Sequence, residues 1–135
     1  MTRAQFDAHC SALPGTTNVV QWGDASVWKV GGKIFAICSN WGTASADAIA
    51  FKCSDLAYQM LCERDGVGPA PYLARAKWVQ VRSNDALSDD DIRAYVVEAH
   101  KLVAAKLTRR QRADLGLPDP KTANPEAVDP KPTDT

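Results

Sequence analysis

Side chains that could perform catalysis are few in this sequence and stand far apart. Its two histidines, His9 and His100, both fall in segments with a helical pattern, and neither accompanies a serine or cysteine in a nucleophile motif. The one run of carboxylates, Asp89–Asp91, follows a serine that can cap a helix, where the helix dipole already favours negative charge. The stretch GVGP at 66–69 lacks the lysine and the Ser/Thr of a phosphate-binding loop. These patterns predict a protein that is not an enzyme.

The cysteine spacing gives no sign of a metal or a cofactor. The four cysteines form no C-x-x-C pair; they are Cys10, Cys38, Cys53 and Cys62. The N-terminal stretch MTRAQFDAHCSALPG has no apolar core of a secretory signal. We therefore expect reduced thiols in the cytoplasm, with neither a disulfide framework nor a metal site. No apolar run approaches the ~18 residues of a membrane span, so no membrane partner is expected.

The composition predicts one folded domain followed by a tail. Of the 135 residues, 45% are hydrophobic and 24% are charged, and the 16 basic and 16 acidic residues balance, which argues against a strong polyanion binder. Residues 118–135 hold five of the eight prolines, three hydrophobic residues and a net charge of −2. That segment cannot bury enough apolar surface to become ordered, so we predict a disordered, acidic, proline-rich tail. Positions 1–117 then form a single domain with a net charge of +2.

Three helices are indicated by capping residues and apolar spacing. Thr2 and Gln5 have the spacing of a capping box for a first helix, which Pro14-Gly15 ends. Ser54 can cap a second helix that runs to about Arg64. Ser88 begins the clearest helix, whose apolar stripe continues to position 107 and whose end is crowded with Lys and Arg.

Five short runs have the composition and alternation of β-strands, at 19–22, 26–30, 34–39, 48–52 and 78–82. Gly31-Gly32 between the second and third runs predicts a two-residue hairpin, since both turn positions can take a positive φ. Residues 66–77 are punctuated by Gly and Pro and are expected to form a loop. The order α-β-β-β-β-α-β-α predicts an α+β fold with a single antiparallel sheet and helices packed on one face.

The hairpin turn also predicts which residues share a face of the sheet. It would place Trp28 opposite Phe35 and Lys29 opposite Ile34. The side chains then expected beneath the helices are Trp28, Val30, Phe35, Ile37, Ile49, Phe51, Val79 and Val81. Those expected on the reverse face are Lys29, Lys52, Trp78, Gln80 and Arg82, with Ala36 and Cys38 also directed there. Cations beside an aromatic ring suit phosphates and bases, although a solvated outer face with Trp78 covered by the 66–77 loop gives the same pattern.

Several motifs resemble those of the YjbR/MmcQ family. They are LPGT (13–16), VWKVGGKIFAI (27–37), FKC (51–53), GVGPAPYLARAKWVQV (66–81) and LVAAKLTRRQR (102–112). The resemblance implies a small α+β fold like bacterial frataxin, described as a double-wing DNA-binding fold. It points to Lys33, Lys52 and Lys77-Trp78 as contact residues. The sequence departs from the family pattern at AHKLV (99–103), where a Ser-Tyr pair is usual, and at ARAKW (74–78), where a run like Asn-Lys-Arg-His-Trp is typical.

The resulting hypothesis is a non-enzymatic DNA-binding module without a cofactor. Its candidate contact residues are Lys29, Lys33, Lys52, Arg75, Lys77, Trp78 and Arg82. The alternative is a protein-interaction or regulatory module in which the 66–77 loop forms a pocket beside Trp78. An iron-binding role like that of frataxin is disfavoured, because the first helix offers only one carboxylate, Asp7, and no acidic ridge.

Overall fold

The computed structural model describes residues 1–21, 24–39, 48–70, 76–82 and 86–117. The predicted tail at 118–135 therefore lies outside the described residues. The elements in chain order are α1 (Arg3–Ser11), β1 (Thr16–Gln21), β2 (Ala25–Val30), β3 (Lys33–Ser39), β4 (Ala48–Lys52), α2 (Asp55–Cys62), β5 (Val67–Pro69), β6 (Trp78–Val81), α3 (Asp89–Ala104) and α4 (Arg109–Asp114). None of the described helices is both long and apolar enough to cross a bilayer.

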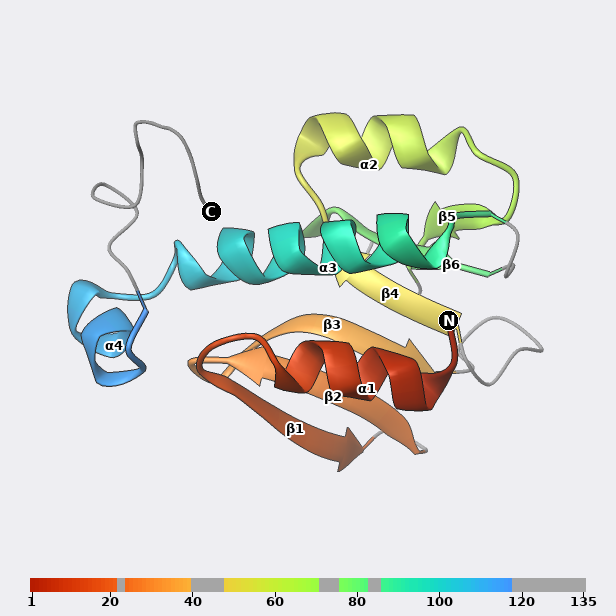
Figure 1. Ribbon diagram of the computed structural model, residues 1–135. Helices are drawn as coiled ribbons and strands as arrows, with labels where there is room; N and C mark the ends of the chain where they lie inside the picture. The colour runs from red at the N-terminus through yellow and green to blue at the C-terminus, as the bar shows by residue number, and fades with distance from the viewer. Residues whose placement is uncertain (22–23, 40–47, 71–75, 83–85, 118–135) are drawn as a thin grey trace.

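The strands form one antiparallel sheet in the order β1-β2-β3-β4-β6-β5. α1 lies against β1 and β2, α3 crosses the middle strands, and α2 lies over β5 and β6 (Figure 1). Buried side chains from all three helices join a single core cluster with the sheet, so the helices cover the same face. The predicted α+β class, the single antiparallel sheet and the one-sided helices are confirmed.

Helix starts follow the predicted caps. The Thr2 hydroxyl accepts a hydrogen bond from the Gln5 N–H at 3.2 Å, and the Gln5 side chain accepts from the Thr2 N–H at 2.9 Å, which completes the capping box. Ser54 and Ser88 cap α2 and α3 in the same way through their hydroxyl oxygens. These caps depend on residues that are close in sequence, so they could be predicted without knowledge of the tertiary structure.

Two short elements were not predicted. Val67–Pro69, expected to be loop, adds β5 to the edge of β6. The final helical pattern is also interrupted, because α3 ends at Ala104 and a new capping box between Thr108 and Gln111 starts α4. The Arg112 guanidinium folds back and donates to the Leu107 carbonyl. This hydrogen bond satisfies a backbone oxygen that lies where the chain turns between the two helices.

A β-bulge corrects the predicted faces of the β2–β3 hairpin. The tight turn is as expected, with Val30 opposite Lys33, Lys29 opposite Ile34, and positive φ at Gly31 (60°) and Gly32 (80°). The register then shifts, so Trp28 pairs with Ala36 and not with Phe35. One extra residue in β3 reverses every side chain beyond it.

The bulge therefore changes which side chains of β3 reach the helices. Phe35, Ala36 and Cys38 all join the helix-side core, whereas Ile37 is buried on the reverse face. The prediction of Ile37 beneath the helices, with Ala36 and Cys38 on the other face, was wrong.

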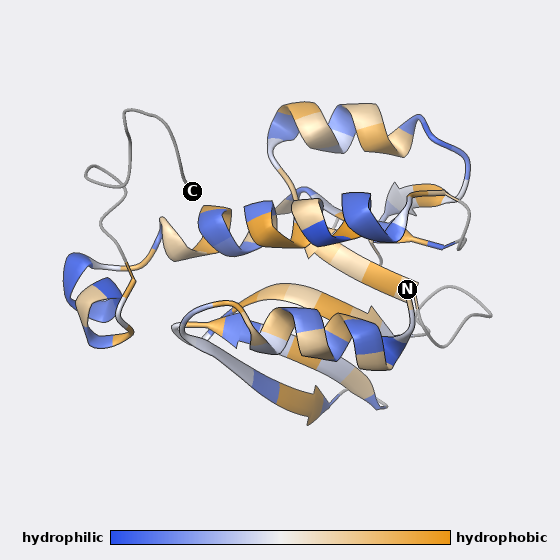
Figure 2. Ribbon diagram, in the orientation of Figure 1, coloured by the Kyte–Doolittle hydropathy of each residue, from blue (hydrophilic) through white to orange (hydrophobic). Residues whose placement is uncertain are grey.

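The reverse face carries a core of its own. A second cluster of buried residues lies there, comprising Ala25, Val27, Ile37, Ala50, Ala70 and Trp78, with Ile34 packed at its margin. Trp78 is only 4% exposed and Gln80 is fully buried, so this face does not display either side chain to solvent; of the two alternatives for Trp78, the covered ring is the one observed. Figure 2 shows β4 as an almost continuous apolar strand, as expected for a strand buried on both faces.

Candidate functional site

Strand register brings four of the predicted contact residues to one end of the sheet. Lys29 and Lys33 flank the β2–β3 turn, and Lys52, the last residue of β4, pairs with Trp78, the first residue of β6. Lys77 directly precedes that strand. The same end of the sheet holds the end of α3, together with α4 (Figure 1).

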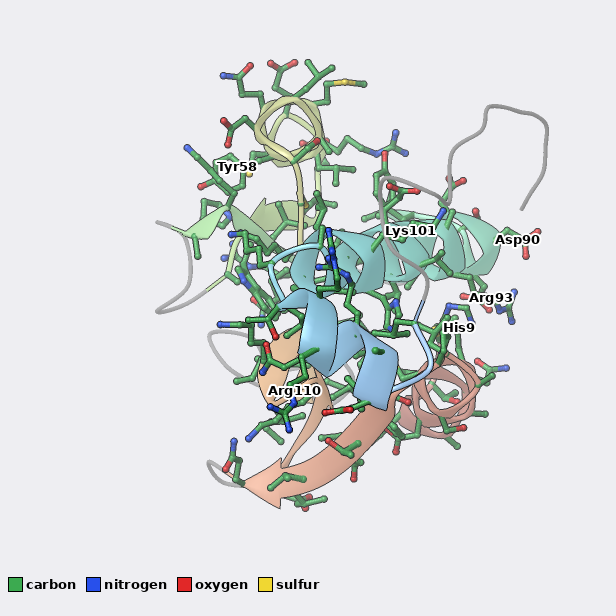
Figure 3. The ribbon with its side chains drawn as sticks, turned by 90° about the vertical axis from the view of Figure 1, so that its left-hand side faces the viewer. His9, Tyr58, Asp90, Arg93, Lys101 and Arg110 are labelled. Carbon is green, nitrogen blue, oxygen red and sulfur yellow. The ribbon has the colours of Figure 1, made fainter. Side chains whose placement is uncertain are left out.

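Two glycine contacts attach α4 and the segment before it to this end. A Cβ built on Gly31, at the hairpin tip, would lie 2.7 Å from the δ-carbons of Leu107, and one built on Gly15 would lie 3.2 Å from Cβ of Leu115. We call this region the basic end; its cations are Lys29, Lys33, Lys52, Lys77, Lys106, Arg109, Arg110 and Arg112. Figure 3 looks directly at it, with α4 and Arg110 toward the viewer.

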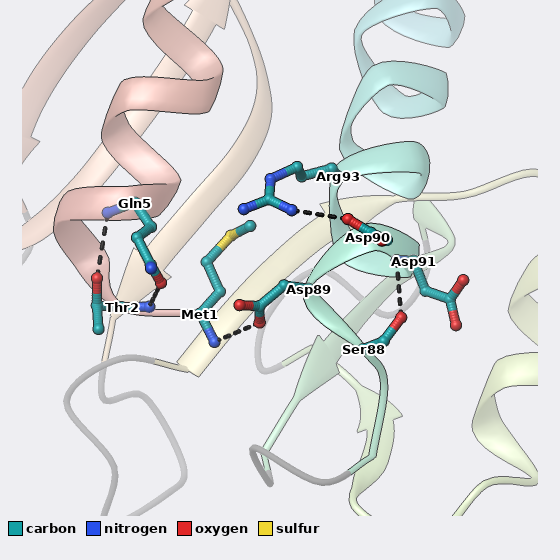
Figure 4. A network of polar contacts seen from close by, with 8 residues as sticks. All are labelled: Met1, Thr2, Gln5, Ser88, Asp89, Asp90, Asp91 and Arg93. Atoms are coloured by element: carbon teal, nitrogen blue, oxygen red, sulfur yellow. Dashed lines mark hydrogen bonds and ion pairs between the residues drawn. The ribbon is translucent and has the colours of Figure 1, made fainter.

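The basic end stands opposite an acidic one. Three of the four ion pairs within the described ranges lie at the far end of the molecule: the Met1 amino group with Asp89 (2.8 Å), Arg93 with Asp90 (2.8 Å) and Arg3 with Asp24 (3.5 Å). Figure 4 shows the first two at the start of α3. We call Asp24, Asp89, Asp90 and Asp91 the acidic end.

Four cations of the basic end have neither a carboxylate nor a hydrogen-bond partner among the described residues. Among the described residues, Lys29, Lys33, Lys106 and Arg110 have no ion-pair partner; the fourth ion pair joins Lys101 to Glu98 on α3. Two carboxylates also stand near this end of the fold, Asp55 at the start of α2 and Asp114 at the end of α4. The molecule is therefore polarised along the strands although its charges nearly balance.

Lys52 is the most constrained of these cations. It is half-buried, and its Nζ donates to the Ala76 carbonyl at 2.6 Å. Burial lowers the pKa of Lys52, and the nearby Lys106 ammonium lowers it further. Two ammonium groups that repel one another favour an anion placed beside both, since the anion would offset the repulsion and the cost of burial.

Lys77 occupies a left-handed backbone conformation, with φ of 63°. Its carbonyl accepts a hydrogen bond from the Cys53 N–H at 2.8 Å, and its Nζ lies 5.0 Å from the centre of the Tyr58 ring. The side chain remains exposed above this ring, which fixes its position without neutralising its charge.

Trp78 and Arg82 do not join this group. Trp78 belongs to the buried reverse-face cluster. Arg82 follows the opposite end of β6, about 13 Å along the strand from Trp78. Its guanidinium donates to Gln80 Oε1 at 3.0 Å and to the Pro69 carbonyl at 2.8 Å, so it braces the β5–β6 pair. Arg75 lies outside the described residues.

Sequence reasoning missed the contribution of α4. The cations near positions 106–112 were interpreted as complementing the dipole of one long helix. The Thr108–Gln111 capping box was the local signal for a second helix, and α4 carries Arg109, Arg110 and Arg112 at the hairpin end of the sheet. Within the described residues, no group of three or more His, Cys, Asp and Glu side chains could hold a metal ion.

The fold and the site together define a small α+β protein whose open antiparallel sheet is covered by helices on one face and ends in a cluster of cations. Residues 11–102 match the family model described as YjbR, and this chain belongs to the YjbR family.

Two solved structures share the fold. The crystal structure of Deinococcus radiodurans protein DR2400, with a DUF419 domain, is 21% identical; the match covers 87% of this chain and 90% of that one, with a TM-score of 0.75. A Pseudomonas syringae protein is 20% identical, with coverage of 76% and 99% and a TM-score of 0.63. The comparison with curated proteins found no match.

Proposed function

We propose that this protein is a non-enzymatic module that binds the phosphate backbone of DNA through its basic end, in the cytoplasm. The observation that carries the proposal is a group of cations from the hairpin and the α3–α4 region that have no carboxylate partner within the described ranges: Lys29, Lys33, Lys106 and Arg110. Most contacts of proteins with DNA are made to phosphate and sugar, and cations supply the affinity.

The elements that present these cations support this proposal. The β2–β3 turn is a tight two-residue hairpin, and its tip is held against Leu107 by the close approach of Gly31. Lys33 therefore stands on a wing whose position relative to Lys106 is fixed by packing. A preorganised set of donors loses less conformational entropy when it binds a backbone of regularly spaced charges.

Because Trp78 is buried, we propose duplex DNA and not single-stranded DNA as the ligand. Binding of single strands commonly uses exposed aromatic rings on which bases stack, and the Trp78 ring is covered. Contacts to phosphate need only exposed cations. With three or four contacts, affinity should be modest and should fall with salt at a log–log slope of about −3 to −4.

The test is fluorescence anisotropy of a labelled duplex at about 50 and 200 mM salt, a range over which counterion release changes affinity strongly. The variant Lys33→Gln/Lys106→Gln/Arg110→Gln should bind more weakly and should flatten the slope by about two to three units. The matched control is Arg93→Gln, at the acidic end, which should leave the slope unchanged. Absence of binding by the wild type at high micromolar protein and low salt would refute the proposal.

A second candidate function is protein interaction, and one observation favours it. Leu56 and Met60 are 67% and 58% exposed and lie one turn apart on α2, which packs beside β5. An exposed apolar pair on a helix is a common anchor for a protein partner. The pocket expected in the 66–77 loop involves residues 71–75, which lie outside the described residues. Leu56→Ser/Met60→Ser should leave the anisotropy result unchanged if DNA is the ligand.

A further inference from the structure

The two edges of the sheet differ in how they are protected against pairing. The β5 edge has three residues, and one of them is Pro69, which has no N–H to donate. The β1 edge has six residues, Thr16–Gln21, with the sequence TTNVVQ, which contains neither a charge nor a proline. It pairs with β2 in unbroken register along its whole length, so no bulge turns it away.

Among the residues that the structure describes, nothing pairs with the outer side of β1. In an antiparallel ladder, about half of its residues direct their N–H and C=O groups outward. Val19 and Val20 are 38% and 56% exposed and point to opposite faces. Natural edge strands are usually blunted by charge, proline or a bulge, and β1 has none of these features.

The charges at the two ends of β1 favour a second copy of this chain as the strand that pairs with this edge. The basic end stands where β1 begins, since Leu115, just after α4, packs against Gly15. Asp24 stands just past the end of β1; it pairs with Arg3 at 3.5 Å, but its side chain is 84% exposed and still faces solvent. If a second β1 lay antiparallel to the first, the basic end of each copy would face the acidic end of the other. Parallel pairing would instead bring like charges together.

We propose that β1 pairs antiparallel with β1 of a second copy of this chain, forming a two-fold dimer with one sheet continuous through both copies. Such an interface is isologous, so each residue meets its counterpart or a symmetry-related neighbour. A single strand edge buries little area, which places the association in the weak, micromolar class. The inference does not depend on the proposed DNA binding.

The experiment is sedimentation equilibrium of the full chain from about 5 to 500 μM, which brackets that affinity class. The wild type should pass from monomer to dimer. Val19→Lys/Val20→Lys should raise the dissociation constant about tenfold or more, because it places like charges across the two-fold axis. The control Val19→Thr/Val20→Thr keeps β-branched, uncharged side chains and should stay within about threefold.

A second variant keeps the test valid if the lysines disturb folding. Asp24→Asn removes the charge, and asparagine, like aspartate, tolerates the positive φ of 75° at this position. It should weaken the dimer about two- to threefold at low salt, and the effect should vanish at high salt, because exposed charges are then screened. A wild type that stays monomeric over the whole range, or a dimer that neither the lysine variant nor Asp24→Asn weakens, would overturn the proposal.

Discussion

The backbone of Gly31 lies directly against the side chain of Leu107, so closely that a Cβ at Gly31 would come within 2.7 Å of both δ-carbons. This contact joins the tip of the β2–β3 hairpin to the segment between α3 and α4. It is the point at which two groups of cations, one on the hairpin and one beyond α3, acquire a fixed relative position.

Substitution of Gly31 should therefore be costly for stability. Gly31→Ala adds both a positive-φ strain and a clash with Leu107, and we expect a loss of about 2–4 kcal/mol in the free energy of unfolding. Gly32→Ala is the matched control, because its φ is 80° but nothing lies within 4 Å of the added Cβ. It should cost about 1 kcal/mol. Urea unfolding of both variants checks this, and equal losses would show that the Leu107 contact is unimportant.

Substitution of Phe35 should lower the free energy of unfolding far more than substitution of the nearby cation Lys33. Phe35 is fully buried and meets the His100 ring edge-on, with centroids 5.3 Å apart. Phe35→Ala should lower the free energy of unfolding by about 3–5 kcal/mol, the usual range for a large core aromatic. Lys33→Ala, two residues away and exposed, should stay within about 0.5 kcal/mol. Similar losses in chemical denaturation would contradict the observed core.

These residues also show what the sequence could and could not predict. Caps and the Gly-Gly turn depend on a few adjacent residues, and they were predicted correctly. The bulge near Phe35 was not, because the middle of β3, IFAIC, is apolar and fits either face, so only packing of β3 between two clusters selects the register. Of the predicted contact residues, Lys29, Lys33, Lys52 and Lys77 lie together at the basic end. Arg82 lies apart from them, because β6 runs away from the basic end.

His100 should make stability depend on pH. It is buried, its ring nitrogen Nε2 lies 2.8 Å from the Pro14 carbonyl, and burial lowers its pKa. In the unfolded chain His100 has its ordinary pKa of about 6.5, so it binds a proton at a higher pH than in the folded protein. The free energy of unfolding is therefore fully retained above about pH 6.5, and it falls as the pH drops from there toward the lowered pKa of the folded state. Thermal unfolding between about pH 7.5 and 5.5, around that reference pKa, should show the decline. The variant His100→Gln should show a smaller one, and an identical slope in the two proteins would assign the effect to other groups.

The proline-rich tail should contribute nothing to the stability of the domain. Its few hydrophobic residues cannot offset the entropy lost on ordering, so deletion of residues 118–135 should change the free energy of unfolding by less than about 1 kcal/mol. Thermal unfolding of the truncated and full chains at equal concentration is the measurement. A larger loss would mean that the tail packs on the domain.

Variants of Arg82 and Lys106 should distinguish a cation that stabilises the fold from one that binds DNA. Arg82 braces β5 against β6 through Gln80 and Pro69, and its guanidinium nitrogen would lie 2.9 Å from a Cβ built on Gly68. Arg82→Gln should therefore cost about 1–2 kcal/mol of stability and leave the salt slope of DNA binding unchanged. Lys106 is exposed at the basic end, so Lys106→Gln should keep stability within about 0.5 kcal/mol and flatten the slope by about one unit on every duplex sequence. Parallel anisotropy and urea unfolding of the two variants provide both readouts. If Arg82→Gln flattens the slope and Lys106→Gln does not, the DNA-binding surface is the strand face near β5 and not the basic end.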